Sequence, residues 1–250
     1  MLSPIEDWGN AGDASPMAWA SDATSAPAFL AIVLHELPED DPPPPGPTPD
    51  VLAWSRALTD RGAAVVAPWT GASWWTDGGV FAREPKPLSA EAAVERSLDW
   101  LTDKHELDAS QVALVGAGMG GHGALRLAYR QPQRYPAVAA LRPAIDWHHA
   151  LDGFGRPSQQ HERLAVLYGD SERARQDSAT LHIHPLNWPR HQRFDCPPAD
   201  PRHEGAERLR MKLTALGVPH EADTHSPDAA DYDTLRVDAA AEWLAERLGR

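Results

Sequence analysis

The feature that most restricts the fold of this chain is the stretch VALVGAGMGGHGALRLAY at residues 112–129. An apolar run leads into closely spaced glycines, and apolar residues at helical spacing follow them. Glycines allow the backbone to turn sharply and allow a strand and a helix to approach each other closely. The stretch therefore predicts a strand, a tight turn and a helix that packs against the strand.

The rest of the chain repeats this alternation of strands and helices. Ser89 is expected to cap the helix that follows it, and Gly62 to end the helix before it. Strands that alternate with helices favour an α/β fold with a mainly parallel sheet and helices on both faces. The predicted strands lie at residues 27–37, 63–69, 111–118, 137–143 and 191–196, and the clearest helical patterns at 48–62, 88–107 and 120–132.

Length and composition favour one domain that spans residues 1–250. The 250 residues are 42% hydrophobic, which is enough to bury a sizeable core. Residues 1–26 are expected to form an irregular N-terminal segment. Residues 37–50, LPEDDPPPPGPTPD, are too rich in proline for a helix or an inner strand, so they predict a stiff exposed loop with polyproline character.

Charge and cysteine content exclude several classes of partner and of site. A formal net charge of -13 argues against nucleic acid and anionic membranes, which bind cationic surfaces. Neither a signal peptide nor an apolar run long enough to span a bilayer is visible, so a cytoplasmic protein is expected. The single cysteine, Cys196, cannot form an internal disulfide, and we expect it to pack at the end of a strand.

Residues 116–125, GAGMGGHGAL, match eight of the ten positions of the motif G-H-S-M-G-G-H-G-A-L. This motif is the nucleophile turn of the esterase D and S-formylglutathione hydrolase-like esterases, which the chain therefore resembles. Segments 67–77, 142–155, 175–192 and 207–223 are also similar to that family in order and spacing. The resemblance covers most of the chain from Phe29 onward and implies an α/β-hydrolase fold.

The resemblance also implies where the catalytic residues of the family would lie. Its nucleophilic serine falls on Gly118, which has no side chain and cannot form an acyl intermediate. Its acid falls on Asp200, whereas the residues alone would favour Asp170, after the strand-like run RLAVLYG. Its histidine base falls on Asp228, and His225 is the nearest histidine that a shifted turn could bring to the site.

The oxyanion donors of the family correspond to the backbone N–H groups of Leu37 and Met119. Glu36 stands where the family has a glycine, and it brings negative charge to a site built for an anion. With Glu36, the tryptophans Trp74, Trp75 and Trp147 are expected to form walls of a ligand crevice.

The remaining histidines could in principle surround a metal. Asp146, His148 and His149 are close in sequence, and His182, His184 and His191 follow later in the chain. No fixed-spacing metal motif is present, so packing and hydrogen-bonding roles are favoured and neither a metal nor a cofactor is expected.

Two function classes remain open on the sequence. The first is a degenerate esterase that is inactive as a serine hydrolase and binds a small molecule or a protein partner. Simultaneous changes at Gly118, Glu36 and Asp228 favour it. The alternative is an active carboxylic-ester or thioester hydrolase with a non-standard site. The ligand and the oligomeric state are left undetermined.

Overall fold

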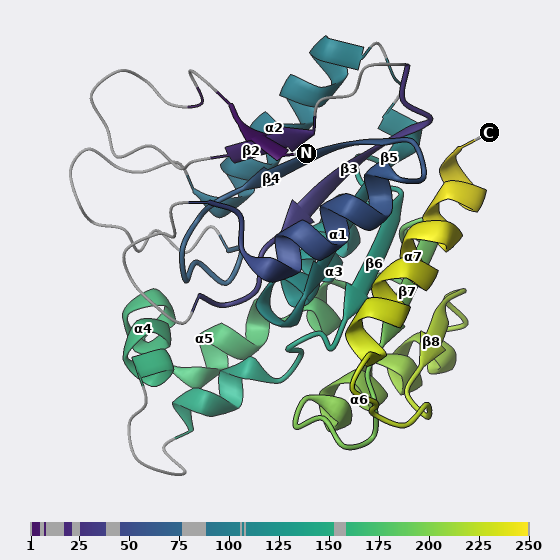
Figure 1. The fold of residues 1–250 in the computed structure, drawn as a ribbon. Helices are drawn as coiled ribbons and strands as arrows, with labels where there is room; N and C mark the ends of the chain where they lie inside the picture. Colours follow the sequence, from purple (N-terminus) through teal and green to yellow (C-terminus); the bar gives the residue numbers. More distant parts are fainter. Residues whose placement is uncertain are drawn as a thin grey trace.

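An eight-stranded sheet runs through the molecule in the order β1-β2-β4-β3-β5-β6-β7-β8 (Figure 1). The computed structural model describes residues 2–5, 8, 18–21, 26–38, 46–76, 89–105, 107, 109–152 and 159–249, and it describes the backbone alone for 159–163. Strands β3 to β8 pair in parallel, whereas β1 and β2 are antiparallel. The strands are β1 (Leu2–Pro4), β2 (Ala18–Ser21), β3 (Phe29–Leu34), β4 (Ala63–Pro68), β5 (Val112–Ala117), β6 (Ala137–Leu141), β7 (His191–Asp195) and β8 (Glu221–Asp223).

Helices cover both faces of the sheet. Helices α1 and α7 lie side by side on one face, where they pack against Phe29, Ala31 and Val33 of β3 (Figure 1). Helices α2, α3 and α6 contribute to the core on the other face, with Leu30 and Ile32 of the same strand. The helices are α1 (Pro49–Thr59), α2 (Ala90–His105), α3 (Gly118–Arg130), α4 (Gln159–Tyr168), α5 (Ser171–Gln176), α6 (His203–Ala215) and α7 (Tyr232–Leu248), and the 3-10 helices are η1 (Ala109–Gln111), η2 (Trp147–Leu151) and η3 (Ala179–His182).

The central elements agree with the expected α/β pattern. Strands β3 and β4 are buried along their whole length because helices cover them on both faces. The Ser89 hydroxyl accepts a hydrogen bond from the Ala92 N–H at 3.1 Å, which confirms the expected cap of α2. Cys196 is fully buried directly after β7, and burial raises the pKa of its thiol to about 12. No helix among the described residues is long and apolar enough to cross a membrane.

Two expectations need correction at the N-terminal side. Residues 1–26 are not irregular throughout, because β1 and β2 extend the sheet beyond β4. Strand β2 has four residues, too few for a periodic pattern, and it is fixed by backbone pairing to β4. The end of the expected 37–50 loop is also different, since Pro49 and Asp50 form the first turn of α1. Residues 39–45 of that loop lie outside the described residues.

The glycines of the turn after β5 allow a very close approach between α3 and β3. A Cβ atom added to Gly120 would lie 1.9 Å from the backbone oxygen of Leu34. A Cβ atom added to Gly123 would lie 2.4 Å from the Cβ of Trp75. The turn is therefore a packing device between strand and helix, whether or not it presents a nucleophile.

We predict that Gly120→Ala lowers the free energy of unfolding by at least about 2 kcal/mol, because backbone atoms of β3 must move to admit the methyl group. Urea denaturation followed by circular dichroism measures the change. Gly46→Ala is the control, since a Cβ atom there would meet nothing within 4 Å. Equal stability of the two variants would show that the close approach does not constrain the fold.

Candidate functional site

The site lies at the carboxyl ends of the parallel strands, where α/β proteins bind their ligands. Ala117 ends β5, and Gly118 begins α3 with a φ of 47°, in the left-handed region that favours glycine. Strand β3 ends on one side of β5, and β6 followed by β7 ends on the other. Residues that follow their ends, Glu36, Arg142 and Asp200, carry the charges of the site.

The side chain of Glu36 turns back onto the turn after β5. Its Oε1 accepts hydrogen bonds from the Met119 N–H at 2.9 Å and from the Leu37 N–H at 3.1 Å. Its Oε2 lies 3.5 Å from Nη1 of Arg202. The two N–H groups predicted as oxyanion donors thus converge on one oxygen, and that oxygen belongs to the protein.

The same carboxylate fills the space beside Gly118. A Cβ atom on Gly118 would lie 1.8 Å from Oε2 and 2.0 Å from Oε1 of Glu36. Such separations are far inside van der Waals contact, so no side chain fits at position 118 while Glu36 keeps this conformation. Glu36 therefore takes both the place of a side chain at the turn and the two hydrogen bonds beside it.

A second charged group, Arg142, ties together the two aspartates assigned by resemblance to the triad. Its guanidinium donates to Asp200 at 2.7 Å, to Asp228 at 2.7 Å and to Asp233 at 2.7 Å. Burial alone would lower the pKa of Arg142, but the hydrogen bonds from its guanidinium to these three carboxylates outweigh burial and raise the pKa. Asp200 and Asp228 are therefore held by a permanent cation.

The two alternatives that the sequence left open lie elsewhere. Asp170 caps α5 by accepting a hydrogen bond from the Arg173 N–H at 2.8 Å, and its side chain is 57% exposed. His225 is exposed, and its backbone N–H donates to Asp223 at 3.1 Å. Neither residue lines the cleft beside Glu36.

This cleft has a volume of about 350 Å³ and lies between Glu36, η2 and the N-terminal end of α6. Trp74 and Trp147 form part of its wall, with their rings stacked at 5.0 Å. Trp75 does not line the cleft, so its expected contact with a ligand is wrong. It is fully buried, packs under Gly123 and donates from Nε1 to the His35 carbonyl at 3.2 Å.

Backbone strain occurs at the carboxyl edge of the sheet, and one strained residue, Trp74, lines this cleft. Among the described residues, Trp74, Trp75 and Arg142 are the non-glycine residues with positive φ, at 53°, 55° and 45°. Each such residue costs on the order of 1 kcal/mol and persists only where its surroundings fix it. Strained residues gather at ligand sites and active sites, so the cleft is the candidate functional site.

Sequence reasoning missed the roles of Arg142 and Arg202. Both arginines follow strands that end at this edge of the sheet, Arg142 directly after β6 and Arg202 in the turn after β7. Position at the carboxyl end of a parallel strand was the available signal. Their partners became clear only from the structure, in which Arg142 pairs with Asp200 and Asp228. Arg202 pairs with Glu36.

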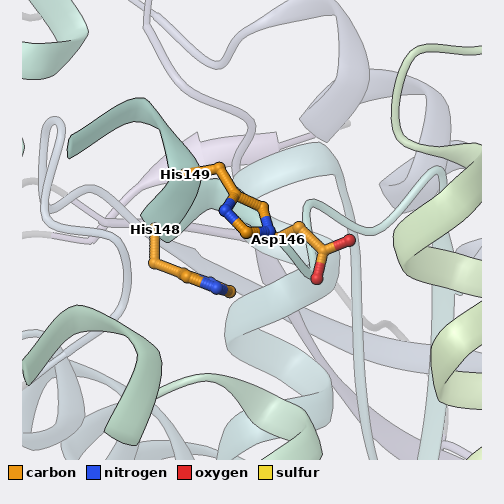
Figure 2. A group of neighbouring side chains, drawn as sticks. All are labelled: Asp146, His148 and His149. Carbon is orange, nitrogen blue, oxygen red and sulfur yellow. The ribbon is translucent and has the colours of Figure 1, made fainter. Parts of the chain in front are cut away.

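Three of the candidate metal-binding residues come together at the mouth of the cleft. One possible ligand atom from each of Asp146, His148 and His149 lies within 4.8 Å of the other two (Figure 2). The other histidines are not part of this group. His182 lies 3.3 Å from Asp177, His184 accepts from the Leu186 N–H, and His191 packs on Trp243.

Two fully buried histidines, His35 and His122, pack against the residues of the site. His35 stacks on Trp69 at 4.2 Å, and burial lowers the pKa of His35 to about 4. His122, in α3, accepts at Nε2 from Trp147 Nε1 at 3.0 Å and from the Ala179 N–H at 3.2 Å. Burial lowers the pKa of His122 to about 3. Both rings are neutral in the folded protein at neutral pH.

These pKa values predict a loss of stability in acid. Each histidine binds its proton more weakly in the folded than in the unfolded state, so stability falls as pH drops below about 6.5, by about 1.4 kcal/mol per pH unit for each ring. The loss continues toward pH 4 for His35 and pH 3 for His122. Urea denaturation between pH 7.5 and 5 measures this slope. His122→Gln should reduce this slope by about 1.4 kcal/mol per pH unit, the contribution of one ring. An unchanged slope would contradict the lowered pKa of His122.

Comparison with known proteins places the chain in a family. The sequence profile of the Esterase family, described as "Putative esterase", matches residues 91–220, which is 130 of the 250 residues. The MPT51 antigen of Mycobacterium leprae is 34% identical over 131 residues, which span 48% of this chain and 38% of that protein.

Solved structures agree on the fold. An S-formylglutathione hydrolase from Agrobacterium tumefaciens superimposes with a TM-score of 0.70 at 18% identity, covering 99% of this chain and 94% of the other. An S-formylglutathione hydrolase from Staphylococcus aureus superimposes with a TM-score of 0.66 at 14% identity, covering 98% of each chain. The chain therefore has the α/β-hydrolase fold and belongs to the Esterase family.

Proposed function

We propose that this chain is a member of the esterase family that does not hydrolyse esters and instead binds a ligand, a small molecule or a group of a protein partner, in the cleft beside Glu36. The observation that carries the proposal is the position of the Glu36 carboxylate. It occupies the space of a side chain at position 118. It also accepts hydrogen bonds from the N–H groups of Leu37 and Met119, the two groups that would stabilise an oxyanion.

Each chemical requirement of ester hydrolysis meets an obstacle in this arrangement. Acyl transfer needs a nucleophile, and glycine offers none at the turn. The developing oxyanion needs two free donors, and a bound carboxylate would repel it as well as compete for them. The nucleophile needs a base within hydrogen-bond reach, but Asp228 is paired with Arg142 at 2.7 Å.

Other features support a binding role for the cleft. It keeps an open volume of about 350 Å³ with aromatic and charged walls. Trp74, in its wall, has a strained backbone of the kind that gathers at ligand sites.

Membership of the family supports the alternative, a hydrolase with a non-standard site. Such a site needs another nucleophile near the cleft. Cys196 is fully buried with a raised thiol pKa, so it forms little thiolate at neutral pH. Ser73 and Ser226 form hydrogen bonds with Trp75 and Asp223, as turn serines commonly do. The alternative is therefore less well supported than the binding role.

We expect no turnover of short p-nitrophenyl esters or thioesters above the buffer rate, and no labelling by a fluorophosphonate probe. The reason is that the probe reports an activated serine, which the site lacks. Intact-protein mass spectrometry measures the labelling, and a known serine hydrolase treated in parallel is the control. Stoichiometric labelling of any serine would establish the alternative.

A double-mutant cycle tests whether Glu36 fills position 118. Gly118→Ser alone should lower the free energy of unfolding by about 3 kcal/mol or more, because the serine displaces a carboxylate with charge-assisted hydrogen bonds and adopts a left-handed backbone. In the Glu36→Gly background the cost should fall to about 1 kcal/mol, the backbone cost alone. Glu36→Gln is the matched control, since an amide of the same size keeps the conflict. Additive costs would contradict the packing of Glu36 against Gly118.

Activity of the same variants gives a second readout. Gly118→Ser alone should be inactive because the base is absent. Adding Glu36→Gly and Asp228→His should raise the rate on an activated ester above that of the single variant, and the gain should be non-additive. Full activity of Gly118→Ser alone would mean that a competent base already stands nearby.

A further inference from the structure

Beside the cleft lies a group of side chains to which the proposed function assigns no specific role. Asp146 precedes η2, and His148 and His149 lie within it. Asp146 and His149 line the cleft, while His148 is buried beneath them. Figure 2 shows the two imidazole rings directed toward the side chain of Asp146. We propose that these three residues bind a divalent transition metal, with Zn²⁺ as the best match.

The buried ring of His148 gives the first independent support. The residue is more than nine-tenths buried, at 8% exposure, and Nδ1 has no hydrogen-bond partner among the described residues. Buried polar atoms in folded proteins almost always have a partner, so a missing one points to a bound ion or water. The ring nitrogens of His148 and His149 and the carboxylate of Asp146 together supply the ligands that Zn²⁺ prefers.

The hydrogen bond of His149 gives the second support. Its Nδ1 lies 2.8 Å from Oδ2 of Asp152. A carboxylate on one ring nitrogen fixes the tautomer that leaves the other nitrogen, Nε2, with a lone pair for a metal. Metal-binding histidines in proteins commonly have such a carboxylate partner.

The spacing requires a small adjustment. Zn²⁺ binds nitrogen and oxygen at about 2.0–2.2 Å, so tetrahedral ligand atoms lie roughly 3.3 Å apart. The three atoms here lie within 4.8 Å of one another. Because the side chains of His149 and Asp152 are 60% and 30% exposed, the hydrogen-bonded pair can shift together toward the other two ligands without disturbing the core. The fourth position would hold water or a ligand group at the cleft.

The positive charge of Arg208 lies beside Asp146 and should weaken metal binding. Its guanidinium pairs with Oδ2 of Asp146 and lies 3.7 Å from Glu204. A fixed positive charge beside a ligand weakens the binding of a cation. Removing this charge should therefore strengthen the site, whereas removing a ligand should weaken it.

The experiment is a calorimetric titration of the full chain with Zn²⁺ in chelator-free buffer. We expect one stoichiometric site, at least about a tenfold loss of affinity in His149→Ala, and a loss of about tenfold in Asp152→Asn, which removes only the partner of a ligand. Arg208→Gln should bind more tightly than the wild type. Cobalt absorption in the visible range should appear in the wild type and be lost in His149→Ala.

His184→Ala is the matched control. His184 is also exposed, and its Nδ1 also forms a hydrogen bond, but it lies outside the group. Its removal should leave the affinity unchanged. Absence of a stoichiometric site, or equal affinity in His149→Ala and wild type, would overturn the proposal. None of the three proposed metal-binding residues is a triad position. The result is therefore independent of whether the chain hydrolyses esters.

Discussion

The interaction on which the site depends is the pair of hydrogen bonds that the backbone N–H groups of Leu37 and Met119 donate to one carboxylate oxygen of Glu36. The N-terminus of α3 adds its positive end, so the anion is held by fixed dipoles as well as by hydrogen bonds. Charge-assisted bonds of this kind contribute about 1.5–3 kcal/mol each. A hydrolase keeps such donors free for the reaction, whereas this chain supplies their partner itself.

The other contacts of the site depend on that carboxylate and on Arg142. Glu36 can turn inward only because position 118 has no side chain. Asp228 and Asp200 can lie close together because Arg142 neutralises both. A single substitution at position 36, 118 or 228 would therefore break an existing contact. Because Arg202 pairs with Glu36 and its N–H donates to Asp200, which Arg142 also binds, these residues form one connected unit.

Much of the fold could be predicted from the sequence because its signals are local. Apolar strands, helical spacing, the Ser89 cap and the glycine turn each depend on a few neighbouring residues. Strands β1 and β2 were missed because backbone pairing between distant segments defines them: β1 pairs with β2, and β2 pairs with β4. At the site, Gly118, Glu36 and Asp228 could be singled out from the motif. The turn of the Glu36 side chain onto the N–H groups of Leu37 and Met119 depends on side-chain direction, which spacing does not specify. The same is true of the three ion pairs of Arg142.

Chemical rescue tests most directly whether Glu36 fills the donor site. The Glu36→Gly variant should leave both N–H groups without their carboxylate, and a small carboxylate such as acetate should bind there. Thermal unfolding of this variant and of the wild type is measured with increasing sodium acetate, against sodium chloride at matched ionic strength. The account predicts that acetate raises the melting temperature of Glu36→Gly selectively, because binding to the folded state stabilises it. An equal response of the two proteins to acetate would contradict the account.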